Sequence, residues 1–262
     1  MFLAIDVGNT NIVLGLYDGT KLEHFWRLQT MVGRTADEYG ITVRGLLEGA
    51  GARAISGIAI ASVVPPINRV LETLCQRYIG PKPLFIGPGV RTGLPILYDK
   101  PQEVGADRVV NAVAAFHRTH AATIVVDFGT ATTFDVVSDD GTYVGGVIAP
   151  GLGVSLDALI ARAAKLPKVE IKKPDSIMGT NTIAAIQAGT VYGYIGLVDG
   201  IVKRIFDAHP GVPFKVLATG GLAGLIGQES EYIETVEPFL TLEGLRLIHE
   251  RKKASGQRTS DV

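Results

Sequence analysis

Hydrophobic and polar positions follow a pattern that occurs twice along this chain. Residues 5–15 read Ile-Asp-Val-Gly-Asn-Thr-Asn-Ile-Val-Leu-Gly, and residues 126–136 read Val-Asp-Phe-Gly-Thr-Ala-Thr-Thr-Phe-Asp-Val. Each copy begins with an apolar run, breaks at Asp-x-Gly followed by Asn or Thr, and continues with β-branched and apolar residues toward an Asp-Gly pair. Short apolar runs bounded by Asp and Gly are typical of β-hairpins. We therefore predict two equivalent hairpins, in which Asp127 corresponds to Asp6, 121 residues earlier.

The elements predicted after each hairpin are also similar in kind. In the first half they are a strand at 21–30, a helix from Thr35 to about Glu48, a buried strand at 56–64, a helix that starts at Pro65-Pro66 and a strand at 83–87. In the second half they are a strand at 142–150, helices at 154–164 and 182–209, and a buried strand at 214–219. Residues 165–176 are predicted as a surface connection and residues 255–262 as a frayed tail.

This order of elements predicts the fold class and the domain organisation. Three antiparallel strands followed by alternating helix and strand, twice over, predict an α/β protein with two lobes of mixed sheet that face each other across a central cleft. We place the two lobes at residues 1–115 and 116–262.

Composition and charge indicate which kinds of partner and which location to expect. The 262 residues include 25 basic and 26 acidic side chains, so we expect neither nucleic acid nor anionic lipid as a partner. The first residues lack the charged and apolar regions of a secretory signal. The apolar stretch at 183–202 contains Gln187, Asp199 and four glycines, which favours a buried interface helix over a membrane span. The single Cys75 lies on the apolar face of a predicted helix, and together these features predict a cytoplasmic protein without a disulfide framework.

The two repeated turns carry candidate chemistry. A glycine at the tip of a strand-turn-strand lets backbone N–H groups approach an oxyanion, so two such turns can hold a polyphosphate. Phosphoryl transfer needs a divalent cation, and Asp6 and Asp127 are the carboxylates available to hold Mg²⁺ directly or through its waters. Either turn alone is more typical of an ordinary hairpin. No P-loop sequence occurs, and the five histidines lack the spacing of zinc ligands.

Five short motifs resemble, in their order, those of type III pantothenate kinases. They are Asp6-Val7-Gly8-Asn9-Thr10-Asn11, Gly105-Ala106-Asp107-Arg108, Asp127-Phe128-Gly129-Thr130, Gly145-Gly146 through Pro150-Gly151, and Thr219-Gly220-Gly221. The resemblance covers nearly the whole chain, from residue 2 to about residue 250. The Asp-Gly turns are shared with the wider actin-like ATPase superfamily of sugar kinases, acetate kinase, Hsp70 and actin, whereas Gly-Ala-Asp-Arg is the specific element. The resemblance implies two duplicated ribonuclease H-like lobes of the actin-like ATPase fold.

The same resemblance implies an activity and a role for individual residues. The activity is ATP-dependent phosphorylation of pantothenate to 4′-phosphopantothenate, the first step of coenzyme A biosynthesis, with Mg²⁺ and a monovalent cation, K⁺ or NH₄⁺. The residues implied to bind ATP are Asp6, Val7, Gly8, Asn9, Thr10, Asn11, Ile12, Val13 and Thr130. Those implied to bind pantothenate are Tyr98, Gly105, Ala106, Asp107, Arg108 and Thr182, with Asp107 as the catalytic base. Asp127 is implied to bind the monovalent cation, and Gly220 and Gly221 resemble an adenosine-binding turn.

Each of the substrate residues also has a purely structural interpretation. Asp107 directly precedes a predicted helix, where aspartate is a favoured N-cap. Arg108 has the alternative of a surface arginine in the first turn, although a guanidinium fork suits the carboxylate of pantothenate. Thr182 is also interpretable as a helix cap and Tyr98 as a packing residue. The first turn contains no Lys or Arg, so cations must neutralise most of the phosphate charge.

Assembly and the rival functions complete the predictions. Gly189, Gly193, Gly196 and Gly200 form a small-residue stripe on the helix predicted at 182–209. This stripe favours a homodimer, with close packing inside its own lobe as the alternative.

Two rival functions are a catalytically inactive nucleotide-binding regulatory protein of the same fold, and a superfamily kinase of another small metabolite. An inactive protein predicts a degraded Gly-Ala-Asp-Arg motif, and the motif is intact here.

Overall fold

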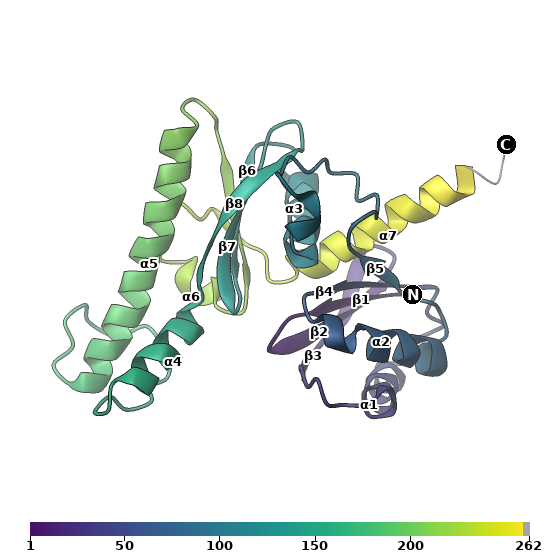
Figure 1. Cartoon of the computed structure of the whole chain (residues 1–262), viewed down its shortest axis with the longest axis horizontal. Coiled ribbons are helices and arrows are strands. Elements are labelled where there is room, and N and C mark those ends of the chain that lie inside the picture. Colours follow the sequence, from purple (N-terminus) through teal and green to yellow (C-terminus); the bar gives the residue numbers. More distant parts are fainter. Residues whose placement is uncertain (259–262) are drawn as a thin grey trace. The chain divides into compact units, whose positions relative to one another are not determined.

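The computed structural model of the chain describes the backbone of residues 1–258 and the side chains of residues 1–255. It contains two five-stranded mixed sheets, each covered by helices (Figure 1). The contacts between residues divide the chain into two compact units. The first unit contains Met1–Ala114 together with the C-terminal helix, and the second contains Ala115–Phe239.

The first unit is built on one sheet and its helices. Its strands are β1 (Phe2–Val7), β2 (Asn11–Asp18), β3 (Lys21–Gln29), β4 (Gly57–Ser62) and β5 (Leu84–Ile86), in the order β3-β2-β1-β4-β5. Its helices are α1 (Ala36–Gly49), α2 (Pro65–Leu74), the π-helix η1 (Cys75–Ile79), the 3₁₀ helix η2 (Pro101–Glu103), most of α3 (Ala106–Thr119) and α7 (Leu240–Arg258). Strands β1, β2 and β3 are antiparallel neighbours, whereas β4 and β5 run parallel to β1.

The second unit repeats this arrangement. Its strands are β6 (Thr123–Phe128), β7 (Ala131–Val137), β8 (Tyr143–Pro150), β9 (Lys215–Gly220) and β10 (Thr235–Val236), and its helices are α4 (Leu152–Arg162), α5 (Thr182–Ala208) and α6 (Ala223–Ile226). Read from β8, the strand order β8-β7-β6-β9-β10 matches β3-β2-β1-β4-β5. The strand directions match as well, because β6, β7 and β8 are antiparallel and β9 and β10 run parallel to β6. The predicted duplication is therefore confirmed.

Helices cover both faces of the first sheet. Residues Leu3, Ile5 and Val7 of β1 pack with α1 and α2 in one apolar cluster. The other face meets α7, where Phe2 stacks on His249 at a ring-centroid distance of 4.6 Å. Figure 1 shows α1 and α2 on the side of this sheet opposite α7. Burial on both faces explains why β1 reads as a continuous apolar run that stops only at the half-buried Asp6.

Two local predictions in the first unit are confirmed by side-chain contacts. Thr35 caps α1 with a complete capping box, in which its hydroxyl accepts from the Glu38 N–H and the Glu38 carboxylate accepts from the Thr35 N–H. Cys75 is fully buried, and burial raises the pKa of its thiol to about 12. A thiol with this pKa stays protonated at neutral pH, so Cys75 is a packing residue.

Helix α5 forms much of the core of the second unit. Val191, Tyr194, Val198, Val202 and Ile205 on one face pack with the second sheet. By length and composition alone, α5 could also span a membrane, because an 18-residue window of it has a mean hydropathy of 1.2, and 33% of that window is buried. One face of α5 packs in the core of the second unit, so length and hydropathy alone do not make it a membrane span.

The C-terminal segment differs from its prediction. Helix α7, which the sequence assigned to the lobe at 116–262, packs on β1 and β4 of the first sheet. The tail predicted at 255–262 is helical as far as Arg258, and residues 259–262 lie outside the described part of the chain. Leu242 and His249 explain the packing, since they fit against Gly15 and Gly57, which leave room for them on the sheet.

Candidate active site

The first repeated turn joins β1 to β2 and is held by Thr30, the residue that follows β3. The Gly8 N–H donates to the carbonyl of Asn11 at 2.9 Å, which closes the turn. Thr30 braces it from outside, because its hydroxyl donates to the Gly8 carbonyl at 2.7 Å and its N–H donates to the Thr10 carbonyl at 2.9 Å. Asn9 and Thr10 are exposed at the tip. The turn is thus a fixed loop with accessible polar groups.

The second repeated turn joins β6 to β7 and lies against the end of β9. The Gly129 N–H donates to the carbonyl of Ala131 at 3.0 Å. Gly220 has a φ of +94°, and a Cβ there would lie 2.6 Å from Oδ1 of Asp127. Only glycine combines this φ with so close an approach. The structure therefore brings the predicted Thr219-Gly220-Gly221 motif directly beside Asp127.

Asp6 and Asp127 hold the same place in their sheets. Asp6 pairs with Val13 and Ala61, and Asp127 pairs with Thr133 and Thr219, in each case one antiparallel and one parallel neighbour. Both aspartates are half-buried and lie one residue before the carboxyl end of the strand. This end is where α/β sheets bind ligands.

The carboxylates near the two turns fit a cation that is bound together with the phosphates of a nucleotide. No group of three or more His, Cys, Asp or Glu side chains able to hold a metal occurs within the described residues. Mg²⁺ in nucleotide sites commonly takes one or two carboxylates, with waters and phosphate oxygens completing the shell. A single half-buried carboxylate such as Asp6 fits that requirement.

The Gly-Ala-Asp-Arg motif forms the start of α3. The carboxylate of Asp107 accepts a hydrogen bond from the Arg108 N–H at 2.8 Å. Burial raises the pKa of Asp107, and the hydrogen bond and charge of Arg108 oppose this shift only in part. A carboxyl group with a raised pKa is better matched to accepting a proton than an exposed aspartate is.

Three structural alternatives from the sequence are wrong. Helix α3 begins at Ala106, and the Val109 N–H already donates to the Gly105 carbonyl, so Asp107 is inside the first turn and is not the N-cap. Arg108 is 8% exposed and is no surface arginine. At α5 the cap is Asn181, whose side chain accepts from the Ala184 N–H at 2.9 Å, and Thr182 is the first helical residue.

A small cavity lies beside the motif within the first unit. Its volume is about 290 Å³, and its lining is mostly apolar. Among the lining residues are Thr92, Gln102 and Ala106, the last from the motif itself. Tyr98, in the irregular segment between β5 and η2, is 37% exposed and is therefore not a core packing residue.

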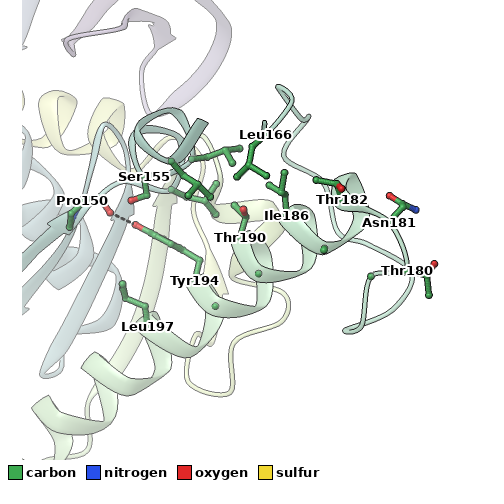
Figure 2. A pocket seen from close by; sticks show the side chains of 17 residues that line it. Pro150, Ser155, Leu166, Thr180, Asn181, Thr182, Ile186, Thr190, Tyr194 and Leu197 are labelled. Atoms are coloured by element: carbon green, nitrogen blue, oxygen red, sulfur yellow. Dashed lines mark hydrogen bonds between the residues drawn. The ribbon is translucent and has the colours of Figure 1, made fainter. Parts of the chain in front are cut away.

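A larger groove lies in the second unit between α4 and α5 (Figure 2). Its volume is about 910 Å³, and it is lined on one side by Leu156 and Leu159 and on the other by Thr182 and Ile186. Thr182 lies toward one end of the groove, and Tyr194 lies farther along α5 and points toward Pro150.

The glycine stripe of α5 faces open space. A Cβ added to Gly189, Gly193 or Gly196 would meet no heavy atom within 4 Å outside the neighbouring helix backbone, and at Gly200 only the Arg204 guanidinium would be near, at 3.2 Å. Close packing of the stripe inside its own lobe is therefore wrong for the described residues.

The structure distributes the predicted residues over the two units. Residues 6–13, Tyr98 and the motif at 105–108 belong to the first unit, whereas Asp127, Thr130 and Thr182 belong to the second. Sequence reasoning did not single out Thr30, Tyr194 or Asn181 as residues that hold the turns and α5 in place. Asn181 had a detectable signal, since Asn before a helix is a favoured N-cap. Thr30 and Tyr194 act through long-range hydrogen bonds, which leave no local pattern.

Comparison with known sequences identifies the family. The sequence profile of the type III pantothenate kinase family matches residues 2–204. The chain is 58% identical over 255 residues to a type III pantothenate kinase from Anaeromyxobacter sp. strain K, with 97% of this chain and 100% of the relative covered. It is 55% identical over 257 residues to one from Myxococcus xanthus, with the same coverage. Identity to one from Geobacillus sp. strain WCH70 is 54% over 253 residues, covering 96% of this chain and 98% of the relative.

Comparison with solved structures identifies the fold. Component A of (R)-2-hydroxyglutaryl-CoA dehydratase from Acidaminococcus fermentans matches with a TM-score of 0.58 at 18% identity, covering 97% of this chain and 98% of that one. The activator of 2-hydroxyisocaproyl-CoA dehydratase from Clostridium difficile, solved with bound ADPNP, matches with a TM-score of 0.52 at 12% identity, covering 98% and 97%. The duplicated sheets are those of the actin-like ATPase fold, as predicted.

Proposed function

The chain belongs to the type III pantothenate kinase family, and from this premise we propose how its residues carry out the family's reaction. The protein is a phosphotransferase that uses ATP to phosphorylate pantothenate on an alcohol group, giving 4′-phosphopantothenate for coenzyme A biosynthesis. The observation that carries the residue assignment is the half-buried carboxylate of Asp107, with its raised pKa, within an intact Gly-Ala-Asp-Arg motif.

We assign Asp107 as the catalytic base. The primary hydroxyl of pantothenate attacks the γ-phosphorus of ATP, the bond to the β,γ-bridging oxygen breaks, and ADP leaves. The hydroxyl proton passes to the Asp107 carboxylate. The raised pKa of Asp107 supports this role, because burial favours the protonated product of the transfer. In phosphoryl transfer the position of such a base matters more than its strength.

The first turn is proposed to bind the ATP phosphates. Residues 6–13 offer backbone N–H groups and the exposed polar side chains of Asn9 and Thr10 at the carboxyl end of β1. Asp6 would hold Mg²⁺ directly or through its waters. When bound, Mg²⁺ neutralises phosphate charge, which this turn needs because it contains no Lys or Arg.

The second turn is proposed to bind nucleotide and a monovalent cation. Thr130 is exposed at its tip, which suits a contact with nucleotide. Asp127 lies beside Gly220, so a K⁺ or NH₄⁺ ion bound by its carboxylate would also lie close to backbone at the end of β9. Gly220 and Gly221 are the proposed adenosine turn.

Pantothenate is proposed to contact Tyr98, residues 105–108 and Thr182. Arg108 supports this assignment best, because its side chain is buried to 8% exposure near the start of α3. The Arg108 guanidinium is a planar fork of N–H donors, and pantothenate brings a carboxylate that such a fork binds in a bidentate way. Tyr98 and Thr182 are accessible, as substrate contacts require.

We propose that the protein is a homodimer that uses α5 as part of its interface. The glycine stripe of α5 faces open space, and Ile183 at the start of the same helix is 50% exposed. Four glycines inside a helix are costly, at about 1 kcal/mol each relative to alanine, and close approach of a second helix compensates for that cost.

Cytoplasmic location without membrane or nucleic-acid partners completes the proposal. It is supported by the formal net charge of −1 and by the packing of the apolar face of α5 in the core of the second unit.

A coupled assay of ADP release tests the activity. The purified protein is given ATP, pantothenate, Mg²⁺ and K⁺, and ADP release is followed with and without pantothenate. ADP formation that depends on pantothenate and falls away in Asp107→Asn supports the proposal. Nucleotide binding without pantothenate-dependent turnover would instead indicate the regulatory protein of the same fold.

A further inference from the structure

A tyrosine of α5 reaches from the groove to the strands that carry the second turn. The Tyr194 hydroxyl lies 2.6 Å from Oγ1 of Thr132 and 2.8 Å from the carbonyl oxygen of Pro150. Tyr194 is 7% exposed and Thr132 is 1% exposed, so the hydrogen bond between their hydroxyls is buried. Burial raises the pKa of the Tyr194 hydroxyl, which therefore remains a neutral donor.

Both partners of Tyr194 lie next to the turn at Thr130. Thr132 is the second residue of β7, directly after the turn, and its register partner in β6 is Phe128. Pro150 ends β8, and Gly151 follows it with an N–H that donates to the Thr130 carbonyl at 3.1 Å. The Tyr194 hydroxyl thus ties together the two backbone segments between which the turn is held.

Gly151 lies so close to the turn that no side chain would fit between them. A Cβ on Gly151 would lie 2.3 Å from the Thr130 carbonyl oxygen and 2.5 Å from the Gly129 carbonyl oxygen. A small displacement of Pro150 and Gly151 therefore changes the position of the turn directly, because close-packed backbone transmits such shifts. Tyr194 is the side chain that fixes Pro150 from the α5 side (Figure 2).

We propose that Tyr194 is a positioning residue that sets the second turn for nucleotide binding from the groove side of α5. The proposal rests on the proposed function, in which Thr130 contacts nucleotide. Tyr194 itself does not touch the nucleotide. It acts through Pro150 and Thr132, and it connects the groove that it lines with the turn at Thr130.

Tyr194→Phe tests this coupling because it removes the hydroxyl and keeps the ring in the core. Binding of Mg²⁺ with a non-hydrolysable ATP analogue to the full-length protein is measured by calorimetry. We expect Kd to rise about two- to tenfold, which is the loss of a net hydrogen bond of about 0.5–1.5 kcal/mol. The KM for ATP should rise with it, while the KM for pantothenate stays at the wild-type value.

Two variants separate positioning from general packing. Tyr192→Phe removes the same group from the same helix, and no hydrogen bond joins Tyr192 to the Thr130 turn among the described residues, so its Kd should remain at the wild-type value. Thr132→Val removes the partner hydroxyl in β7. If the two hydroxyls act as one unit, adding Thr132→Val to Tyr194→Phe raises Kd by less than the product of the single effects.

Thr130→Ala distinguishes failure of the coupling from failure of the proposed function. If Thr130→Ala weakens nucleotide binding and Tyr194→Phe does not, the coupling is wrong and the nucleotide role of the turn stands. Normal Kd values for both overturn the nucleotide role and the coupling with it. An equal loss in Tyr192→Phe also overturns the coupling, since any change in α5 would then suffice. Thr132→Val provides the same test if Tyr194→Phe does not fold.

Discussion

The carboxylate of Asp107 accepts a hydrogen bond from the N–H of the next residue, Arg108, at 2.8 Å. This contact stabilises the charged carboxylate, and so does the Arg108 guanidinium. Burial outweighs both and raises the pKa of Asp107. The hydrogen bond from the Arg108 N–H therefore orients the Asp107 carboxylate, and the pKa of Asp107 stays raised despite it.

Replacing Asp107 by asparagine should largely abolish turnover. The amide keeps the size of the side chain and its ability to accept from the Arg108 N–H, but it cannot take a proton at neutral pH. Loss of a general base commonly lowers the rate about 10²- to 10⁴-fold. The coupled ADP assay measures kcat, while calorimetry with the ATP analogue should give the wild-type Kd. Near wild-type turnover would show that Asp107 is not the base.

The same substitution should stabilise the protein at neutral pH. Because the folded-state pKa of Asp107 is raised above the 3.8 of an unperturbed aspartate, the folded state binds the proton more tightly than the unfolded state. Stability from this group is thus present below about pH 3.8 and is lost as pH rises through the raised pKa. Asparagine has no charge to bury and avoids that loss.

Thermal unfolding at several pH values checks this expectation. The Tm of Asp107→Asn should exceed that of the wild type at pH 7, and the difference should shrink as the pH falls through the raised pKa of Asp107 and disappear below about 3.8. A variant that is less stable than the wild type at pH 7 would show that the hydrogen bond from Arg108 outweighs burial.

The comparison of sequence and structure shows which features leave a local signal. The repeat around Asp6 and Asp127 was readable because Asp-x-Gly must interrupt a buried strand at the same place in each lobe. The capping box of Thr35 and Glu38 was readable because both partners are three residues apart.

Long-range packing left no such signal. The position of α7 on the first sheet depends on glycines more than 180 residues earlier in the chain, such as Gly57 under His249. The burial of Arg108 likewise follows from surrounding elements, since a first-turn arginine is usually exposed. The hydroxyl of Tyr194 also leaves no local signal, since only the fold brings it within hydrogen-bond distance of the Pro150 carbonyl.

Asp6→Ala and Asp127→Ala should have different effects on cation dependence. Asp6→Ala deletes the carboxylate proposed for Mg²⁺ and should weaken binding of the Mg²⁺-nucleotide complex. Asp127→Ala should weaken activation by K⁺ instead. Initial rates measured against Mg²⁺ and K⁺ concentration separate the two. Unchanged cation and ATP dependence in both variants would contradict the assignment of the two turns.

Gly220→Ala should disturb Asp127 without removing its carboxylate. The added Cβ would lie 2.6 Å from Asp127 Oδ1 and 2.7 Å from the backbone of Phe128, at a φ of +94° that alanine disfavours. We expect weaker activation by K⁺, in the same direction as Asp127→Ala. Gly224→Ala in α6 is the matched control, because a Cβ there meets nothing within 4 Å. An equal effect of both changes would point to general sensitivity of this region.

Replacing Gly193 and Gly196 by leucine should dissociate the proposed homodimer. Neither glycine has a neighbour within 4 Å of an added Cβ in the single chain, whereas leucine would obstruct a second helix that approaches the stripe closely. Thr182, a proposed pantothenate contact, begins the same helix. We therefore expect a rise in the KM for pantothenate together with a shift from dimer to monomer in sedimentation.

Gly45→Leu in α1 is the control for this last change, because Gly45 is also an exposed helical glycine with nothing within 4 Å. It should leave both the sedimentation and the KM of the wild type unchanged. The wild type is measured first at micromolar concentration. If it sediments as a monomer of 27.8 kDa and still phosphorylates pantothenate, the dimer is not required, and the exposed stripe of α5 needs another explanation.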